Sequence, residues 1–479
     1  MHIPSRTLAW IALVALASLA AAHRPPSAAP PGPDTIRIPF ERYTLPNGLT
    51  VILSPDHTTP TVTVNVWYHV GSKNEVPGRT GFAHLFEHIM FTGSGHVPYG
   101  LHDKLTEGVG GENNGTTSND RTTYFETVPS NYLESALWIE ADRMGYLLDT
   151  LDLAKLDAQR DIVKNERRQG VDNQPYGKVR EIVSRAMYPA DNPYSWDVIG
   201  SMEDLGAASA EDVKNFFRLY YAPNNAFLAI VGDVDTAQTK AWVAKYFSDI
   251  PRGKPVVRPN VPAVTVPAER RFAYEDRVQV ARLYVQWPTV GERHDDHYAL
   301  EVLGSILSGP RTARITKALV YDQEAAASVS AGQRSREDVG EFALTITPRP
   351  GHTLTDLEAA ADAVIEKLKA DGPTAEEIQR ATAGLELEFI EGLEFNLGKA
   401  MGLCDGAGFH DDPNHYKIDF QKSMAVTAAD VKRVANQYLT KGRIVLSVVP
   451  AGKAGEASKP AESRKVTGAE DTPRPEVKR

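Results

Sequence analysis

One segment, Gly81-Phe82-Ala83-His84-Leu85-Phe86-Glu87-His88-Ile89-Met90-Phe91, guides the interpretation of the whole chain. On a helix, His84 and His88 lie one turn apart on the same face, with Glu87 beside them. Two imidazoles in this arrangement can bind one metal ion, and the carboxylate can take a proton from a water molecule at that metal. The apolar neighbours indicate a buried helix, in which unpartnered histidines and a glutamate would be costly. We therefore expect a metal site rather than a chance cluster of polar side chains.

A zinc site with two histidines needs a third protein ligand if one position is to stay open for water. The apolar period predicts a helix over residues 153–169, and Glu166 falls on the same inward stripe as Val163. Arg167 and Arg168 are expected to point towards solvent or the domain edge. Glu166 is therefore the candidate third ligand. An ordinary surface ion pair of Glu166 with one of these two arginines remains the alternative at this point.

Length and composition indicate a globular protein. The chain has 479 residues, of which 42% are hydrophobic, enough for about two to four domains with sizeable cores. The net charge of -10 argues against a nucleic-acid partner. Cys404 is the only cysteine, so no intramolecular disulfide can form and stability must come from packed cores.

The first 22 residues have the pattern of a signal peptide. Arg6 supplies positive charge, residues 8–19 are an apolar run too short to span a bilayer comfortably, and Ala20-Ala21-Ala22 offers a small-residue cleavage site. We therefore expect an exported protein, periplasmic or secreted. No transmembrane helix is expected after the signal peptide.

The remaining chain divides into two similar parts. Strands are expected over 49–54, 61–70 and 116–128, with a glycine-rich loop over 108–115. Near the end of each half, a helix ending in tyrosine passes through a short turn into an apolar strand. The resulting fold class is α+β, with two homologous halves, each an antiparallel-rich sheet covered by helices. The expected parts are a signal peptide (1–22), a disordered leader (23–35), an N-terminal domain with the metal motif (36–253), a proline-rich linker (254–268), a C-terminal domain (269–451) and a disordered tail (452–479).

The motif and the later segment Arg160-Asp161-Ile162-Val163-Lys164-Asn165-Glu166-Arg167-Arg168 resemble the pitrilysin and insulinase family of zinc metallopeptidases, which includes the mitochondrial processing peptidase. The sequence pattern H-x-x-E-H over residues 84–88 is the inverzincin motif. The resemblance covers nearly all of residues 36–450, and its motifs occur in the order that the family has.

This resemblance implies a zinc endopeptidase that cleaves peptides or unfolded segments. One Zn2+ per chain would be held by His84, His88 and Glu166, and Glu87 would be the general base. Asn114, on an edge strand, would help to orient a peptide that adds to the sheet as a further strand. A turn residue in a glycine-rich loop is the alternative for Asn114. The family's two halves close like a clam shell around a chamber.

The sequence departs from the family pattern in two places. Gln159 stands where several relatives have an acidic residue. Relatives that are active alone carry an arginine and a tyrosine seven residues apart in a later half, and here Val320 and Ala327 stand at those places. Neither can donate a hydrogen bond to an oxyanion. Arg314 and Tyr321 have the right separation but different surroundings, so they are a weak substitute.

These departures motivate a hypothesis about partners. The chain would be the zinc-bearing subunit of a heterodimer, and a related chain without the zinc motif would supply the arginine and the tyrosine; a homodimer is the other arrangement. Two other functions stay open at this point. One is a structural or assembly subunit without catalysis, and the other is a metal-binding protein that is not a peptidase.

Overall fold

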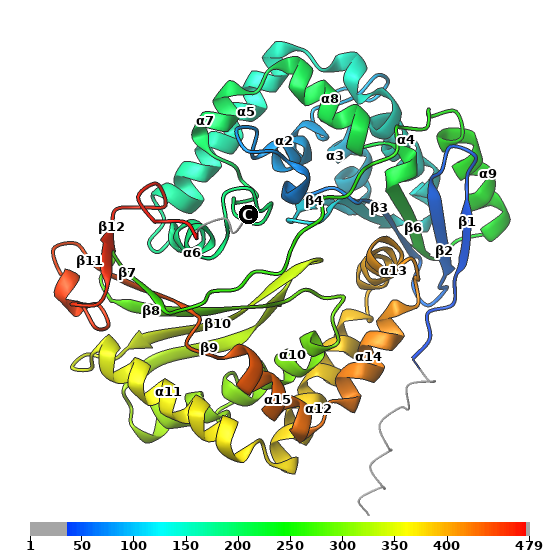
Figure 1. Cartoon of the computed structure of the whole chain (residues 1–479). Helices are drawn as coiled ribbons and strands as arrows, with labels where there is room; N and C mark the ends of the chain where they lie inside the picture. The colour runs from blue at the N-terminus through cyan, green and yellow to red at the C-terminus, as the bar shows by residue number, and fades with distance from the viewer. Residues whose placement is uncertain (1–35, 476–479) are drawn as a thin grey trace, which may run out of the picture. The chain divides into compact units, whose positions relative to one another are not determined.

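The structure is a computed structural model, and it describes residues 36–475. The predicted signal peptide and leader lie outside the described residues. From residue 39 onward the chain forms one unit, which contains two six-stranded sheets with helices packed against them (Figure 1). The prediction of an α+β fold with two halves is therefore confirmed.

The first sheet has the strand order β1-β2-β6-β3-β5-β4. Only β2 and β6 are parallel, and the other neighbours are antiparallel. β3 is central and is buried at seven of its eight positions, which its β-branched and aromatic sequence favours. The strands are β1 (Glu41–Thr44), β2 (Thr50–Pro55), β3 (Thr61–Tyr68), β4 (Glu112–Thr117), β5 (Thr122–Pro129) and β6 (Ala226–Gly232). The helices of this half are α2 (Phe82–Ile89), α3 (Leu101–Thr106), α4 (Leu133–Thr150), α5 (Leu153–Arg167), α6 (Val179–Met187), α7 (Met202–Ala207), α8 (Ala210–Tyr220) and α9 (Thr236–Phe247).

The second sheet has the order β12-β7-β11-β8-β10-β9 and repeats this topology in five of its strands, while β12 pairs in parallel with β7 where β1 is antiparallel to β2. β7 and β11 are parallel, as β2 and β6 are, and β8 and β10 take the places of β3 and β5. The predicted repeat is therefore confirmed. The strands are β7 (Arg270–Asp276), β8 (Arg282–Val290), β9 (Ala326–Ser335), β10 (Val339–Pro348), β11 (Ile444–Pro450) and β12 (Arg464–Val466). The helices are α10 (Asp296–Leu307), α11 (Leu354–Asp371), α12 (Ala375–Gly392), α13 (Asn396–His410), α14 (His415–Ala425) and α15 (Ala428–Tyr438).

The C-terminal segment differs from the prediction of a disordered tail over 452–479. Residues 464–466 form β12, which pairs with β7 in parallel. The guanidinium of Arg185 on α6 donates a 2.9 Å hydrogen bond to the carbonyl of Thr472. The polar, proline-bearing composition suggested disorder, but β7 offers an open edge to which a short strand adds. Residues 476–479 lie outside the described residues.

A second difference concerns the start of β4. The glycine-rich segment 108–115 was predicted as a loop, yet β4 begins at Glu112 and pairs antiparallel with β5 throughout. Its residues Glu112–Gly115 have low strand propensity. Pairing with β5 therefore overrides the local preference, and β4 becomes the edge strand of the first sheet. Residues 251–267, which include most of the predicted linker, contain no helix or strand.

Each half also covers part of the other half's sheet. α13 lies between α12 and α14 of the second half in sequence but packs against β3 and β6 of the first sheet (Figure 1). The indole of Trp67 on β3 donates a 2.8 Å hydrogen bond to Asp405 of α13. Conversely, α6 belongs to the first half but packs against β11, and its Ile182 and Met187 share a buried cluster with Leu446. The two halves are therefore interleaved rather than joined only by the linker.

A buried ionic network also joins the halves. Lys73, which follows β3, contacts Glu337 and lies 3.1 Å from both Asp120 and Asp338. The carboxylate of Glu337, in the β9–β10 turn, is also 2.8 Å from Nε2 of His69. Lys73 and Glu337 are only 3% and 4% exposed, so the two charges compensate each other in a place where either alone would be costly.

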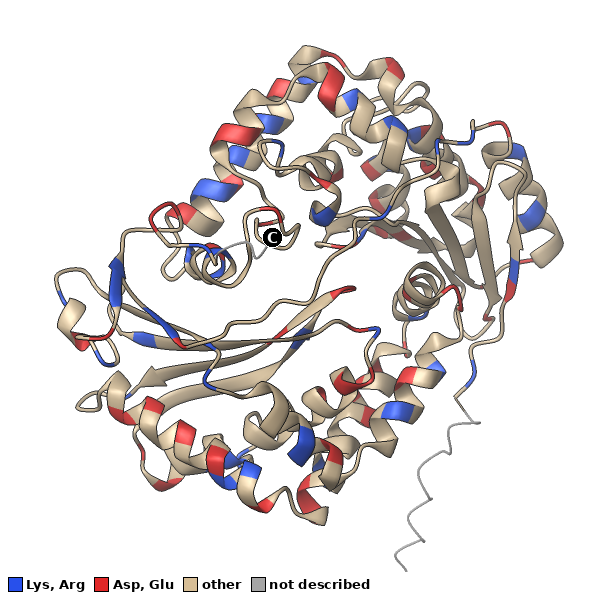
Figure 2. Ribbon diagram, viewed as in Figure 1, with Lys and Arg blue, Asp and Glu red and all other residues tan. Residues whose placement is uncertain are grey.

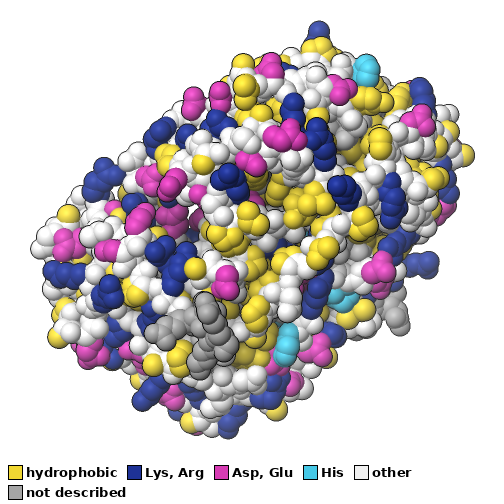
Figure 3. Space-filling view, turned by 45° about the horizontal axis from the view of Figure 1, so that its top comes forward, with side chains coloured by type: hydrophobic (Ala, Val, Ile, Leu, Met, Phe, Trp, Pro, Cys, Tyr) yellow, Lys and Arg dark blue, Asp and Glu magenta, His cyan; other side chains and the backbone are white. Residues whose placement is uncertain are grey.

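The remaining charges are spread over both halves. Lysine and arginine are intermixed with aspartate and glutamate on the helices of each half (Figure 2). The face drawn in Figure 3 likewise shows hydrophobic, acidic and basic side chains side by side, without a large patch of one sign. Among the described helices, none combines the length and the apolar character that crossing a membrane requires.

Candidate metal centre

Helix α2 carries the motif and is fixed at its start by a buried carboxylate. Both oxygens of Glu75 accept 2.9 Å hydrogen bonds, from the backbone N–H groups of Gly81 and Ala83, which are among the unpaired donors at a helix N-terminus. Gly81 has a φ of +89°, and a Cβ there would lie 2.8 Å from the carbonyl oxygen of Ile199. Glycine is therefore required for the turn into the helix. The opposite face of α2 is buried in the first core, as predicted: Phe82, Leu85, Phe86 and Ile89.

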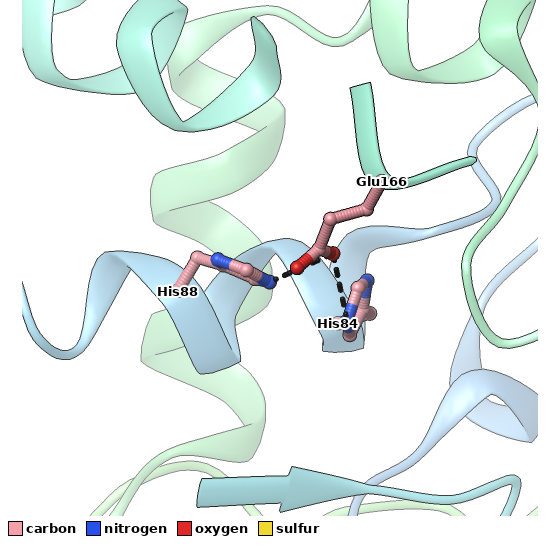
Figure 4. A group of neighbouring side chains, drawn as sticks. All are labelled: His84, His88 and Glu166. Atoms are coloured by element: carbon pink, nitrogen blue, oxygen red, sulfur yellow. Dashed lines mark ion pairs between the residues drawn. The ribbon is translucent and has the colours of Figure 1, made fainter. Parts of the chain in front are cut away.

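The polar face of α2 meets the end of α5. Nε2 of His84 lies 3.7 Å from Oε2 of Glu166, and Nε2 of His88 lies 3.3 Å from the same oxygen (Figure 4). Three ligand atoms, one from each residue, lie within 4.8 Å of one another. With metal–ligand bonds of about 2.0–2.2 Å, neighbouring ligands of a tetrahedral zinc are about 3.3 Å apart. The donor set and its spacing therefore fit one zinc ion with a fourth position left open.

The structure removes one alternative for Glu166, a surface ion pair with a neighbouring arginine. Arg167 pairs with Glu181 at 2.6 Å, and Arg168 donates a hydrogen bond to Oδ1 of Asn165. Glu166 instead faces the two histidines. The prediction that Arg167 points to solvent or the domain edge is wrong, because its side chain is buried and also donates to the carbonyl of Gly200.

The electrostatic environment suits metal binding. Burial, with a smaller contribution from His88, lowers the pKa of His84 to about 4, so its imidazole is neutral at neutral pH and has a free lone pair. Nδ1 of His84 is buried without a hydrogen-bond partner among the described residues. Burial raises the pKa of the Glu87 carboxyl, although Thr117 nearby opposes the shift. A raised pKa brings a carboxylate closer to the range in which it can both accept and return a proton.

Two of the candidate ligands, His84 and Glu166, line an open cavity of about 720 Å³. Its wall includes Glu87 and, from the edge strand β4, Thr116 and Thr117. Gly115 on β4 lies against Glu87, since a Cβ at this position would be 3.1 Å from Cγ of the glutamate. The first sheet's free edge therefore runs directly beside the candidate base.

Asn114 lies on this strand but not in the cavity. It is exposed and does not line the cavity, and its Oδ1 accepts a 2.8 Å hydrogen bond from the N–H of Gly115. It is a strand residue, which removes the turn alternative. Its role towards a peptide stays a prediction.

The structure does not bring Arg314 and Tyr321 to the site. The Arg314 guanidinium makes two 2.7 Å hydrogen bonds with Glu377 at the start of α12. Tyr321 lies under the guanidinium of Arg311, 4.5 Å from it. Neither residue lines the metal cavity. Val320 packs beside the second core and Ala327 lies on β9, so the second half offers no donor from these four positions to the cavity.

The sequence reasoning missed Asp197 and Gln169, which both line the cavity. The negative charge of Asp197 favours the protonated form of His84 and so opposes the lowering of the His84 pKa. Asp197 lies in a segment without helix or strand, where no periodic pattern marks which side chain faces inward. Gln169 follows the end of α5, beyond the regular helix that carries Glu166.

Comparisons with known proteins point to one family. The family model described as "Insulinase (Peptidase family M16)" matches residues 50–195, and the model described as "Peptidase M16 inactive domain" matches residues 207–385. The chain is 29% identical over 404 residues to the zinc protease PqqE of Helicobacter pylori, which covers 83% of this chain and 90% of that protein. It is 25% identical over 425 residues to the probable mitochondrial-processing peptidase subunit beta of Arabidopsis thaliana, covering 85% of this chain and 77% of that protein.

Solved structures are also similar. A protease from Helicobacter pylori has a TM-score of 0.79 and 27% identity, and the match covers 87% of this chain and all of that one. A putative M16-like peptidase from Alicyclobacillus acidocaldarius has a TM-score of 0.76 with 19% identity, covers 87% of this chain and all of that one, and shows the fold alone. Together with the two matched models, these similarities show that the chain belongs to the pitrilysin and insulinase family, peptidase family M16.

Proposed function

We propose that this protein is a zinc-dependent endopeptidase. The observation that carries the proposal is the meeting of three ligand atoms, from His84, His88 and Glu166. The half-buried Glu87 lies beside them and lines one open cavity together with His84 and Glu166. The relatives that are named zinc proteases support it. A zinc ion at this position would act as a Lewis acid and lower the pKa of a water molecule.

The residues of the chain have distinct proposed roles. His84, His88 and Glu166 hold the one zinc ion of the chain. Glu87 accepts a proton from the attacking water and later gives it to the leaving amine. The free edge of β4 binds the peptide as an added strand, which gives main-chain recognition with weak sequence preference, and Asn114 helps to orient it. Peptides or unfolded segments are therefore the proposed substrates.

We also propose a partner chain of the same family. No arginine and tyrosine pair reaches the cavity from the second half, since Val320 and Ala327 stand at the expected places and Arg314 is engaged by Glu377. A related subunit without the zinc motif would supply the missing donors. The interleaving of the two halves through α6 and α13 supports this proposal, because halves joined in this way cannot readily open around a chamber of their own. A relative named as a subunit of mitochondrial-processing peptidase also supports it.

The proposed place of action is outside the cytoplasm, either the periplasm or the medium. The support is the pattern of residues 1–22: positive charge, a short apolar run and three alanines. Cell fractionation of a tagged full-length chain tests it, and recovery only in the cytoplasm would contradict it.

The substitution Glu87→Gln tests the catalytic proposal. It keeps the shape of the side chain but removes its basicity, so we expect unchanged zinc content and loss of peptide cleavage. Cleavage is measured on unfolded peptides by mass spectrometry, with the chain alone and with a candidate partner added. Zinc is measured by inductively coupled plasma mass spectrometry. Unchanged cleavage by the variant would show that another group is the base.

The same experiment separates the alternatives. Bound zinc without cleavage, by the wild type alone and with its partner, would favour a metal-binding or assembly subunit. Full activity of the purified chain alone would contradict the need for a partner.

A further inference from the structure

A second cavity, of about 390 Å³, lies between the start of α6 and strands β8, β9 and β10 of the second sheet. We call it the α6 cavity. The lining residues that matter here are Tyr176, Arg180, Gln286, Arg334, Arg336 and Glu341. None of them is a candidate metal ligand or base.

The α6 cavity is positively charged, although the whole chain carries a net charge of -10. Three arginines and one glutamate line it. Glu341 pairs with Arg336 at 2.6 Å, which leaves two guanidinium groups. Arg180 is half exposed, with a 3.0 Å hydrogen bond to Asn119 and a longer 3.7 Å contact to Asp197. Arg334 is exposed and has no ion-pair partner within 4.0 Å in the described part of the chain.

A buried amide also points to a ligand. Gln286 on β8 lines the α6 cavity and is only 7% exposed, yet its Oε1 has no hydrogen-bond partner among the described residues. A buried polar atom of this kind is costly unless water or a ligand satisfies it. Rotation of the carboxamide exchanges its oxygen and its NH2 group, so Gln286 can offer an N–H donor to an anion.

The backbone at the start of α6 also favours a bound anion. The N-terminus of α6, a helix of nine residues, carries no side-chain cap, and the one acidic residue of its first turn, Glu181, is paired with Arg167. The helix dipole favours a negative charge at this end. Tyr176 precedes the helix with a φ of +63°, and its ring is held under the guanidinium of Arg282, 3.9 Å away. The wall beside the helix end is therefore fixed by packing.

We infer that the α6 cavity binds a peptide carboxylate, either the C-terminal group or an acidic side chain. Two guanidinium groups and an amide donor suit the planar, two-oxygen shape of a carboxylate. The cavity adjoins the candidate metal site, because Arg180 contacts Asp197 and Asp197 lines the metal cavity. A peptide bound along β4 can therefore place an acidic group there. This inference rests on the proposed peptidase function.

Binding of matched peptides tests the inference without relying on cleavage. The zinc-loaded Glu87→Gln protein is titrated with three fluorescent peptides. Two have the same sequence and end in a free acid or in an amide, and the third is the amide with its last residue replaced by glutamate. Fluorescence anisotropy reports each affinity. A charge-assisted hydrogen bond lost from the complex weakens binding roughly tenfold, so we expect the neutral amide to bind about tenfold more weakly than at least one of the other two peptides. Preference for the free acid identifies the terminal carboxylate, and tight binding of the glutamate peptide identifies a side chain.

Two further substitutions show whether the α6 cavity is responsible. Arg334→Gln removes an exposed cation without a partner, so it should fold normally and abolish the preference. Arg380→Gln is the matched control, since Arg380 lies on α12 in a weak surface pair with Glu376 at 3.6 Å, and it should keep the preference. Equal affinities for all three peptides, or a preference that survives in Arg334→Gln, would overturn the inference. A carboxylate preference in a protein that cleaves no peptide would instead refute the proposed function alone.

Discussion

Replacing Gly408 with alanine is expected to destabilise this protein, although alanine is the better helix former. Gly408 lies in α13 where the helix crosses to the first sheet, and a Cβ there would be 2.3 Å from Cη2 and 2.5 Å from Cζ3 of Trp67. The indole cannot readily move. It is fully buried, bonded to Asp405, and flanked by the rings of Phe227 and Phe409 at 5.5 and 5.0 Å.

The magnitude follows from two opposing effects. Alanine in a helix is favoured over glycine by about 1 kcal/mol, whereas overpacking a buried core costs about 1–3 kcal/mol. The net loss for Gly408→Ala is therefore about 0–2 kcal/mol. Gly402, in the same helix, has no atom within 4 Å of the position of an added Cβ. Gly402→Ala should therefore stabilise the protein by about 1 kcal/mol.

The measurement is the free energy of unfolding from urea denaturation, followed by tryptophan fluorescence. The two variants should differ by about 1–3 kcal/mol, with Gly402→Ala the more stable. Equal stabilisation by both substitutions would show that α13 does not approach Trp67 as described. A destabilised Gly402→Ala would show that the space beside this residue is filled.

Three further predictions concern the metal centre and the buried charges. Glu166→Gln should reduce the zinc content well below one ion per chain, measured by mass spectrometry after dialysis, because a neutral amide is a poor zinc ligand; full retention would contradict its role. Arg143→Met should lower the free energy of unfolding by about 3–5 kcal/mol, because it leaves Glu140, fully buried and 2.9 Å from Nε of Arg143, without its charge partner. Hydrogen bonds and charges from His69 and Lys73 outweigh burial and lower the pKa of Glu337 to about 2. The ionised Glu337 carboxylate stabilises the folded state above its unfolded pKa, near 4.5, and this effect is lost as the pH falls towards 2. The free energy of unfolding of the wild type should therefore exceed that of Glu337→Gln by about 2 kcal/mol less at pH 3 than at pH 6.

Two control variants and one contradicting outcome accompany these three predictions. Glu181→Gln changes a carboxylate that pairs with Arg167 and should keep the zinc. Arg380→Met removes a surface arginine and should change stability by less than about 1 kcal/mol. A constant gap between wild type and Glu337→Gln from pH 6 to pH 3 would show that folding does not lower the pKa of the Glu337 carboxyl.

The spacing of the two histidines could be read from the sequence because that information is local. The four-residue spacing of His84 and His88 places both on one face wherever the segment is helical. Helical periodicity also places Glu166 on the inward stripe of its helix. Periodicity does not say which residues Glu166 faces, and only the structure shows that it faces the two histidines rather than Arg167 or Arg168. Asp197 carries no such signal, because it lies outside regular secondary structure.

The strand order repeats because the same pattern of apolar segments occurs twice, and this much could be predicted. Which sheet a helix covers could not. An apolar face on α13 requires burial, but nothing in its sequence states that the partner is β3 rather than β8. The start of β4 and the whole of β12 were missed for a related reason, since both are short polar segments that become strands because a neighbouring strand has a free edge. Propensity is a weak guide at such edges.

Because α13 of the second half covers the first sheet, the first half cannot complete its packing until most of the chain has been synthesised. The first sheet is complete once β6 has been synthesised, but α13, which covers Trp67, emerges more than 160 residues later. Until then, Trp67 and Phe227 on that face of the sheet are not covered by α13, and exposed apolar side chains of this kind promote aggregation. A fragment that ends in the segment 254–268 is therefore expected to misfold or to need a chaperone, even though it contains every candidate zinc ligand. We therefore expect the first half to be soluble only as part of the full-length chain.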